Sequence, residues 1–289
     1  MITVDQAPQG PPGAPQKKSR AGRDLSRAIP VGVFLGAVVA VSVAWNSRLW
    51  YVVAAAAVGL GLWEVFKRFR QSNFRLPFLG LSIAGQAIVW LSWPFGARGA
   101  FAAFAVSVVV LFIWRLFLDG LDKPPANFLR DTSVSIFALA WIAIPGACGA
   151  MLVNGENGGK YVITLIALVV CSDVGGYIAG VLFGKHPMAP AISPKKSWEG
   201  FAGSIVFGIV GGAIIFLFLL DKNVFLGIAL GVVAVVAASL GDLVESQVKR
   251  DLGIKDMGTL LPGHGGLMDR LDSVLPVAVI AWLFVTFWL

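Results

Sequence analysis

The sequence predicts an all-α integral membrane protein with about nine transmembrane helices. Of its 289 residues, 57% are hydrophobic and only 13% are charged, which is too little polar surface to cover a soluble globule of this length. The apolar residues form long runs separated by short polar loops, as expected for membrane spans of about 20 residues. Because every backbone polar group in lipid must be satisfied within its own element, the spans are predicted to be helices.

Nine apolar runs qualify as spans. They cover roughly residues 28–46, 49–66, 76–96, 99–118, 133–153, 161–184, 201–220, 223–240 and 273–289. The chain therefore divides into a basic, disordered tail (residues 1–27), a set of N-terminal spans (28–153) and a C-terminal region that carries most of the polar motifs (154–289). We find no internal repeat of the kind that marks the inverted halves of a transporter.

The distribution of Lys and Arg predicts the topology. Of the 23 basic residues, 19 fall on the side of the tail, and only Arg48, Arg98, Lys160 and Lys222 fall on the other side. Positive charge in short loops marks the cytoplasmic side, so the tail and the polar loops 185–200 and 241–272 are expected in the cytoplasm of a multi-pass protein of the cell (inner) membrane. This distribution also accounts for the net charge of +7 without a nucleic-acid partner.

The loop from residue 241 to residue 272 is the first candidate for chemistry. If the preceding helix extends out of the bilayer, Asp242, Glu245, Ser246 and Lys249 share one of its faces. Five glycines and Pro262 then prevent regular structure, and a Gly-rich backbone among cations suits phosphate groups. Carboxylates beside these cations favour a polyphosphate that arrives with Mg²⁺. The alternative is a solvated loop whose charges only mark the cytoplasmic face.

Two further features are weaker on their own. Lys195 and Lys196 precede Ser197, which is a candidate cap for the next helix and would create an anion-friendly N-terminus. Asp173 lies within an apolar span, where a carboxylate is costly and marks a functional site or a polar helix contact. Glu64, near Lys67 and Arg68, is expected to form surface pairs at a span end, and His186 is expected to be an interfacial residue.

The loop closely resembles the signature of the phosphatidate cytidylyltransferases, also called CDP-diacylglycerol synthases. The resemblance runs through Ser246, Lys249, Arg250, Lys255, Asp256, Gly258, Pro262, Gly263, His264, Gly265, Gly266, Asp269, Arg270 and Asp272, and extends upstream to the segments SLGDLVES, SPKKSWEG and DVGGYIAGVLFGK. Ser197, where many members have Thr, and Gly176, where Ala is frequent, depart from the pattern without changing its chemistry. The first 150 residues match only as a set of hydrophobic spans.

The resemblance implies that CTP and phosphatidate react to give CDP-diacylglycerol and pyrophosphate, with Mg²⁺ as the cofactor. It implies Asp242 and Asp269 as the main metal ligands together with Asp272, and it places Asp173 and Asp256 in support. The implied catalytic residues are Lys249, Arg250, Asp256, His264, Arg270 and Asp173, and the implied substrate-binding residues are Lys195, Lys196, Ser197, Ser246, Lys255, Gly263, Gly265 and Gly266. The expected partners are CTP, phosphatidate and the bilayer, and a homodimer stays open.

Two other functions remain as alternatives. One is a CTP-dependent cytidylyltransferase that acts on another lipid phosphate, such as an isoprenoid phosphate. The other is a membrane transporter or channel in which the charged loop is a gate.

Overall fold

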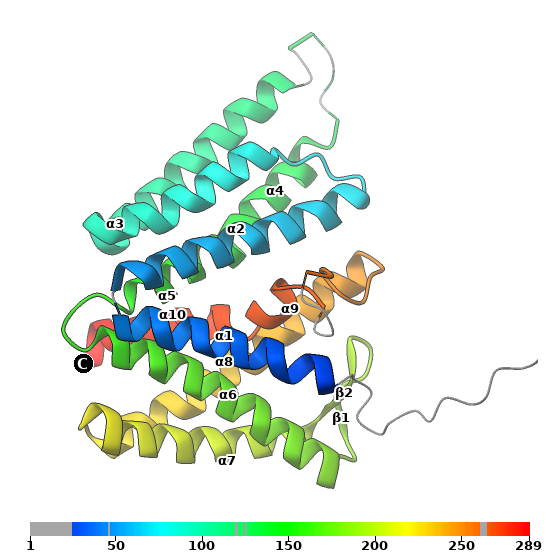
Figure 1. Cartoon of the computed structure of the whole chain (residues 1–289). Helices are drawn as coiled ribbons and strands as arrows, with labels where there is room; N and C mark the ends of the chain where they lie inside the picture. The colour runs from blue at the N-terminus through cyan, green and yellow to red at the C-terminus, as the bar shows by residue number, and fades with distance from the viewer. Residues whose placement is uncertain (1–24, 46, 119–120, 123, 125, 261–264) are drawn as a thin grey trace, which may run out of the picture.

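The structure, a computed structural model, describes residues 25–289 except 46, 119–120, 123, 125 and 261–264 (Figure 1). Its elements are α1 (Leu25–Trp45), α2 (Ser47–Gln71), α3 (Phe78–Leu118), α4 (Phe128–Ala138), the π-helical turn η1 (Leu139–Ala143), α5 (Ile144–Met151), α6 (Gly158–Phe183), β1 (Pro187–Ala189), β2 (Ser193–Ser197), α7 (Trp198–Ile214), the π-helical turn η2 (Ile215–Leu220), α8 (Val224–Asp251), α9 (Met268–Leu271) and α10 (Val274–Trp288). Residues 1–24 of the predicted tail lie outside the described residues. The last three residues of that prediction, Leu25–Arg27, belong to α1.

The helices confirm an all-α membrane protein. Within the described residues, six helices are long and apolar enough to cross a bilayer: Arg48–Gln71, Phe78–Leu118, Phe128–Met151, Gly158–Phe183, Trp198–Leu220 and Val224–Asp251. The segments Gly36–Trp45 and Val274–Trp288 are apolar but shorter. Each of the nine predicted ranges overlaps a helix, whereas the number of helices that span the membrane remains a prediction.

Helix α3 is a hairpin of two helical arms rather than one straight rod (Figure 1). The chain reverses at Gly96, whose φ of 57° and ψ of −147° interrupt the helix two residues after Pro94. This backbone region is open almost only to glycine. The reversal falls at the last residue of the span predicted at 76–96, just before the span predicted at 99–118.

Helix α7 makes the two closest helix contacts, one with α6 and one with α8. The contact between α7 and α8 passes through glycine pairs: a Cβ on Gly212 would lie 2.1 Å from the carbonyl oxygen of Gly227, and a Cβ on Gly231 would lie 2.1 Å from that of Gly208. Small residues of this kind let helix backbones approach in lipid, where apolar burial does not drive association. These three helices therefore form a tight platform.

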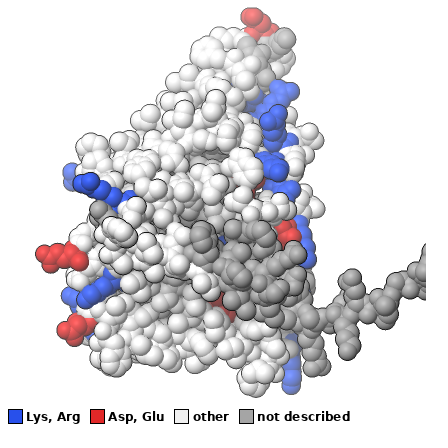
Figure 2. Space-filling view, viewed as in Figure 1, with Lys and Arg blue, Asp and Glu red and all other residues white. Residues whose placement is uncertain are grey.

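The remaining helices complete two halves of the molecule. Helices α2, α3 and α5 pack together, and α10 lies between them and the platform, in contact with α5, α6 and α8. Helix α8 continues past the predicted span 223–240 to Asp251, and the β1–β2 hairpin precedes α7. Both features lie at the edge of the molecule where Lys and Arg gather on the right of Figure 2, whereas basic and acidic side chains mix at the opposite edge.

Candidate active site

A polar cavity of about 560 Å³ opens where α6, β2, α7, α8 and α9 meet. Ten of the residues singled out in the sequence line it: Asp173, Lys195, Lys196, Ser197, Asp242, Lys249, Asp256, Asp269, Arg270 and Asp272. They come from segments almost 100 residues apart in sequence. The fold thus assembles five carboxylates and four cations around one space.

Lys196 and Asp242 form the first ion pair of the cavity. Lys196 Nζ lies 2.6 Å from Asp242 Oδ2 and also donates to the carbonyl oxygen of Ser239 at 3.2 Å. The Ser246 hydroxyl donates to Asp242 Oδ1 at 3.3 Å. Both charged side chains stay about one-third exposed or less, at 26% and 32%, so the pair joins the hairpin to α8 while remaining open to a ligand.

Lys249 forms the second, deeper pair. Its Nζ lies 2.9 Å from Asp269 Oδ1 and 3.4 Å from Glu245 Oε2, and the Glu245 side chain is fully buried. Asp269 also accepts the backbone N–H groups of Met257 and Gly266, at 3.1 and 2.8 Å. Asp269 therefore fixes the fold of the glycine-rich loop in addition to facing the cavity.

Asp272 adds negative charge at the start of α10. Burial and the neighbouring Asp242 carboxylate raise the pKa of Asp272 above its usual range. Asp173, on α6, also interacts electrostatically with Asp272 and Asp242. Three carboxylates thus face one region of the cavity, where a cation would relieve their repulsion.

The glycine-rich loop is held from the other half of the molecule by α2. Oε2 of Glu64, a residue only 1% exposed, accepts the N–H of Met268 at 2.8 Å. Arg68, one turn further along α2, donates through Nε to the carbonyl oxygen of Met257 at 2.7 Å. The interpretation of Glu64 as a surface-paired residue is wrong, because the side chain points into the protein and accepts from the loop.

Glu64 also explains two glycines of the loop. A Cβ on Gly258 would lie 2.0 Å from Glu64 Oε1, and a Cβ on Gly266 would lie 2.6 Å from Glu64 Oε2. Only glycine leaves room for the carboxylate at these positions. A role of Gly266 in substrate binding stays a prediction.

The β1–β2 hairpin ends in the expected cap. Ser197 Oγ accepts the N–H of Gly200 at 3.1 Å and so caps α7, as predicted. His186, expected to be an interfacial residue, pairs through Nδ1 with Glu199, which also accepts the backbone N–H groups of Lys185 and His186. This carboxylate closes the hairpin onto the first turn of α7.

Some predicted site residues lie outside the cavity. Arg250 donates to the carbonyl oxygens of Ile192 and Ile254, Lys255 is exposed, and Ser246 reaches the cavity only through Asp242. Gly265 lies against Asp269, with a positive φ of 83°. Gly263 and His264 lie outside the described residues.

Comparison with known proteins gives a consistent result along the chain. The model of the cytidylyltransferase family matches residues 26–288. A protein of Mycobacterium bovis named phosphatidate cytidylyltransferase is 51% identical over 98% of this chain and 97% of its own length. Proteins of the same name from Mycobacterium tuberculosis H37Rv and Mycobacterium leprae are 51% and 49% identical, over 99% and 92% of this chain and 92% and 89% of their own lengths.

This chain belongs to the cytidylyltransferase family. The family match includes the N-terminal half, for which the sequence motifs gave no specific signal. It also includes Glu64 and Arg68, whose contacts with the loop are long-range. In the sequence, Glu64 lies close to Lys67 and Arg68, so a local surface pair was the simpler interpretation. The sequence pattern therefore gave no sign that Glu64 contacts the glycine-rich loop.

Other residues of the cytidylyltransferase cavity were also missed. Tyr177 and Phe201 line it from α6 and α7, and Ser172, Ser204 and Ser239 contribute small polar groups. Tyr177 follows Asp173 by one helical turn, so the spacing of the two residues could have identified it. The serines resemble the small residues that pack any membrane helix, and only the structure distinguishes them.

The donor set fits a Mg²⁺ ion that arrives with a phosphate ligand. Among the described residues, no three His, Cys, Asp or Glu side chains converge closely enough to hold a metal ion unaided. Mg²⁺ does not need such a cage, because it is commonly held by one or two carboxylates together with phosphate oxygens and water. Asp242 and Asp272 meet that requirement, with Asp173 beside them.

Proposed function

We propose that this protein transfers the cytidylyl group of CTP to phosphatidate, giving CDP-diacylglycerol and pyrophosphate. The observation that carries the proposal is the convergence of Lys195, Lys196, Lys249 and Arg270 with five carboxylates in one cavity. Cations neutralise a triphosphate, and carboxylates admit the divalent ion that accompanies it. The family match and the names of the near-full-length relatives agree with this chemistry.

The reaction is an in-line displacement at the α-phosphorus of CTP. An oxygen of the phosphatidate phosphate forms the new P–O bond as the bond to pyrophosphate breaks, and the electron pair of that bond leaves with pyrophosphate. Lys196 and Lys249 are close to the cavity carboxylates and hold phosphate oxygens in place. Little covalent chemistry falls to the protein, so positioning and charge neutralisation account for the rate.

Mg²⁺ bound with CTP supplies Lewis-acid neutralisation of the phosphate oxygens. Asp242 and Asp272 would hold it, with Asp173 in support. Asp269 remains a candidate ligand, although Lys249 and two backbone N–H groups already contact its oxygens.

The lipid substrate meets the cavity on its apolar side. Tyr177 is 64% exposed on α6, and Phe201 lies beside the capped start of α7. These rings would contact the glycerol and the upper acyl segments while the lysines hold the phosphate. We place this face in the cytoplasm of a protein of the inner membrane with about nine spans, on the basis of the positive charge of its loops. A homodimer remains part of the proposal.

An assay of the purified protein tests the substrate assignment. Labelled CTP is offered with phosphatidate, lysophosphatidate, an isoprenoid phosphate and glycerol 3-phosphate, with and without EDTA. We expect a labelled lipid and pyrophosphate with phosphatidate, and no product in EDTA. A higher kcat/KM for the isoprenoid phosphate would favour the alternative substrate class, and the absence of any labelled lipid would favour the transporter.

A further inference from the structure

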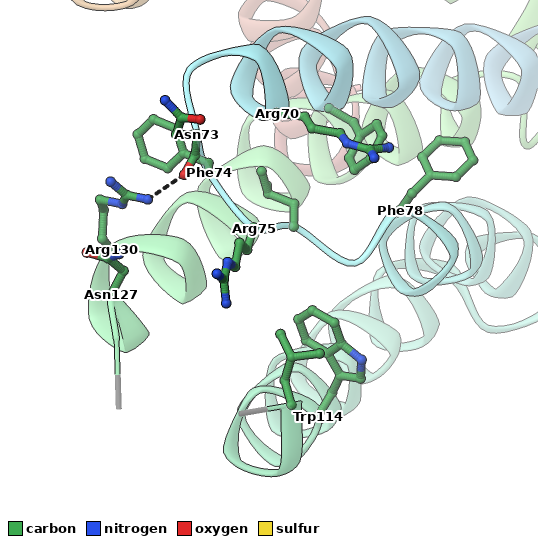
Figure 3. A pocket seen from close by; sticks show the side chains of 11 residues that line it. Arg70, Asn73, Phe74, Arg75, Phe78, Trp114, Asn127 and Arg130 are labelled. Atoms are coloured by element: carbon green, nitrogen blue, oxygen red, sulfur yellow. Dashed lines mark hydrogen bonds between the residues drawn. The ribbon is translucent and has the colours of Figure 1, made fainter. Parts of the chain in front are cut away.

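A second cavity lies in the N-terminal half, away from the residues of the active site. Its volume is about 750 Å³, and it opens between the end of α2, the loop to α3, the second arm of α3 and the start of α4. Arg70, Arg75 and Arg130 line it, together with the aromatic rings of Phe74 and Trp114 (Figure 3). None of its described lining residues is acidic.

Arg130 is held in place by the surrounding structure. The guanidinium of Arg130 lies 4.5 Å from the ring centre of Phe74, and its Nη2 donates to the carbonyl oxygen of Asn73 at 2.7 Å (Figure 3). The buried Asp131 is shared by Arg130 and Arg115, at 3.1 and 3.2 Å. Asp131 itself does not line the cavity, whose described lining holds three arginines and no acidic side chain and is therefore cationic.

An apolar groove continues from this cavity. The groove has a volume of about 820 Å³, lies between the two arms of α3, and shares Phe78 and Trp114 with the arginine cavity. It is lined along residues 77–91 of one arm and 102–114 of the other. At 1.5 Å per residue, its length is about 20 Å, which is enough to pass from the interface to the middle of a bilayer core of about 30 Å.

A cationic pocket joined to an apolar groove matches an amphiphile with a negative headgroup. The geometry points to a binding site for one anionic phospholipid, with its phosphate between Arg70, Arg75 and Arg130 and an acyl chain between the arms of α3. Guanidinium groups bind phosphate oxygens through paired, charge-assisted hydrogen bonds. The phospholipid is a bound companion lipid, and its site does not depend on the proposed reaction.

Native mass spectrometry of the purified full chain in detergent tests this site. The probe is phosphatidylglycerol, whose phosphate is a diester rather than the monoester of the proposed substrate, and phosphatidylcholine is the reference. We expect one phosphatidylglycerol per chain to bind more tightly than phosphatidylcholine. The double variant Arg70→Gln/Arg75→Gln should weaken phosphatidylglycerol binding by about tenfold or more, because two charge-assisted contacts are lost.

Two matched controls separate the headgroup and the acyl-chain contacts. Lys67→Gln removes a cation from the same helix but outside the cavity, and it should change the affinity less than twofold. Val106→Trp fills the groove and should weaken binding, whereas Val109→Trp, on an exposed position of the same arm outside the groove, should not. Inorganic phosphate at millimolar concentration should not compete.

The site is disproved if the double arginine variant binds phosphatidylglycerol as tightly as the wild type. Equal affinity for the two lipids would also overturn it. If inorganic phosphate competes fully and Val106→Trp still binds phosphatidylglycerol normally, the site binds free anions and is not a lipid site. A preserved CTP-dependent activity in all these variants is expected and separates this proposal from the proposed function.

Discussion

The backbone N–H of Met268 donates to Oε2 of Glu64 at 2.8 Å, across 204 residues of sequence. This hydrogen bond joins α2 of the N-terminal half to the turn that carries Asp269 and Arg270. Glu64 lies where Gly258 and Gly266 leave room for it. The N-terminal half therefore positions the active-site loop.

Replacing Glu64 with Ala should lower kcat by about 10- to 100-fold while the KM for CTP changes little. The physical reason is a buried Met268 N–H left without its acceptor, in a loop that must hold Asp269 in place. Glu64→Gln keeps a carbonyl acceptor and should recover part of the activity.

The same variants should speed proteolysis of the loop between residues 253 and 267. Lys67→Ala, three residues along α2 and exposed, is the matched control and should behave as wild type. Wild-type activity in Glu64→Ala would show that the loop holds its shape without this contact.

Asp242→Asn should abolish formation of the CDP-lipid while the protein still inserts and purifies as a monodisperse species. The amide keeps the size of the side chain, but Mg²⁺ binds a carboxylate oxygen far better than an amide oxygen. Asp269→Asn should also abolish turnover, and in addition should lower the melting temperature, because Lys249 and two N–H groups contact the Asp269 carboxylate.

Activity is measured over a range of Mg²⁺ concentrations, with Asp251→Asn, an exposed change outside the cavity, as the control. Near-normal turnover of either variant at limiting Mg²⁺ would remove that residue from the set of ligands. EDTA should silence the wild type.

Lys249→Ala should reduce kcat by about 10²-fold or more, through lost stabilisation of transition-state charge. Arg250→Ala should cost less and act mainly on KM, because the Arg250 guanidinium holds the carbonyl oxygen of Ile192 in the β1–β2 hairpin rather than lining the cavity. Steady-state kinetics with CTP separate the two effects. Lys17→Ala in the tail should leave kcat and KM nearly unchanged. A loss of activity in Lys17→Ala equal to that in Lys249→Ala would mean that the loop charges serve only to set topology.

Single cysteines should be labelled from the cytoplasmic side at Pro190 and Leu260, and from the opposite side at Asn157 and Lys222. The background is a chain without Cys148 and Cys171, which are free thiols. Inverted and right-side-out vesicles are treated with an impermeant maleimide. The reverse pattern would overturn the orientation inferred from the loop charges and move the active site to the other face.

Local patterns in the sequence predicted the helical architecture, and the resemblance to the cytidylyltransferase signature named ten of the residues that line the cavity. Apolar runs mark the helices. The span predicted at 223–240 continues as helix α8 to Asp251, which places Asp242, Glu245, Ser246 and Lys249 on one helix, the case the sequence analysis considered. The contacts of Glu64 and Arg68 with the loop escaped prediction because they join residues about 200 positions apart. The arginine cavity was hidden for the same reason, since its three arginines appear in sequence as ordinary positive-inside charge.

The paired glycines between α7 and α8, here called the glycine seam, limit which substitutions this sequence tolerates. On the outer faces of these helices, one apolar residue replaces another at little cost because only lipid is in contact. At Gly208, Gly212, Gly227 and Gly231, even one added methyl group meets a backbone atom of the opposite helix, and a backbone has no rotamer with which to move aside. Substitutions should therefore accumulate on the lipid-facing side of α7 and α8 and be purged from the seam, where shape rather than hydrophobicity is under selection.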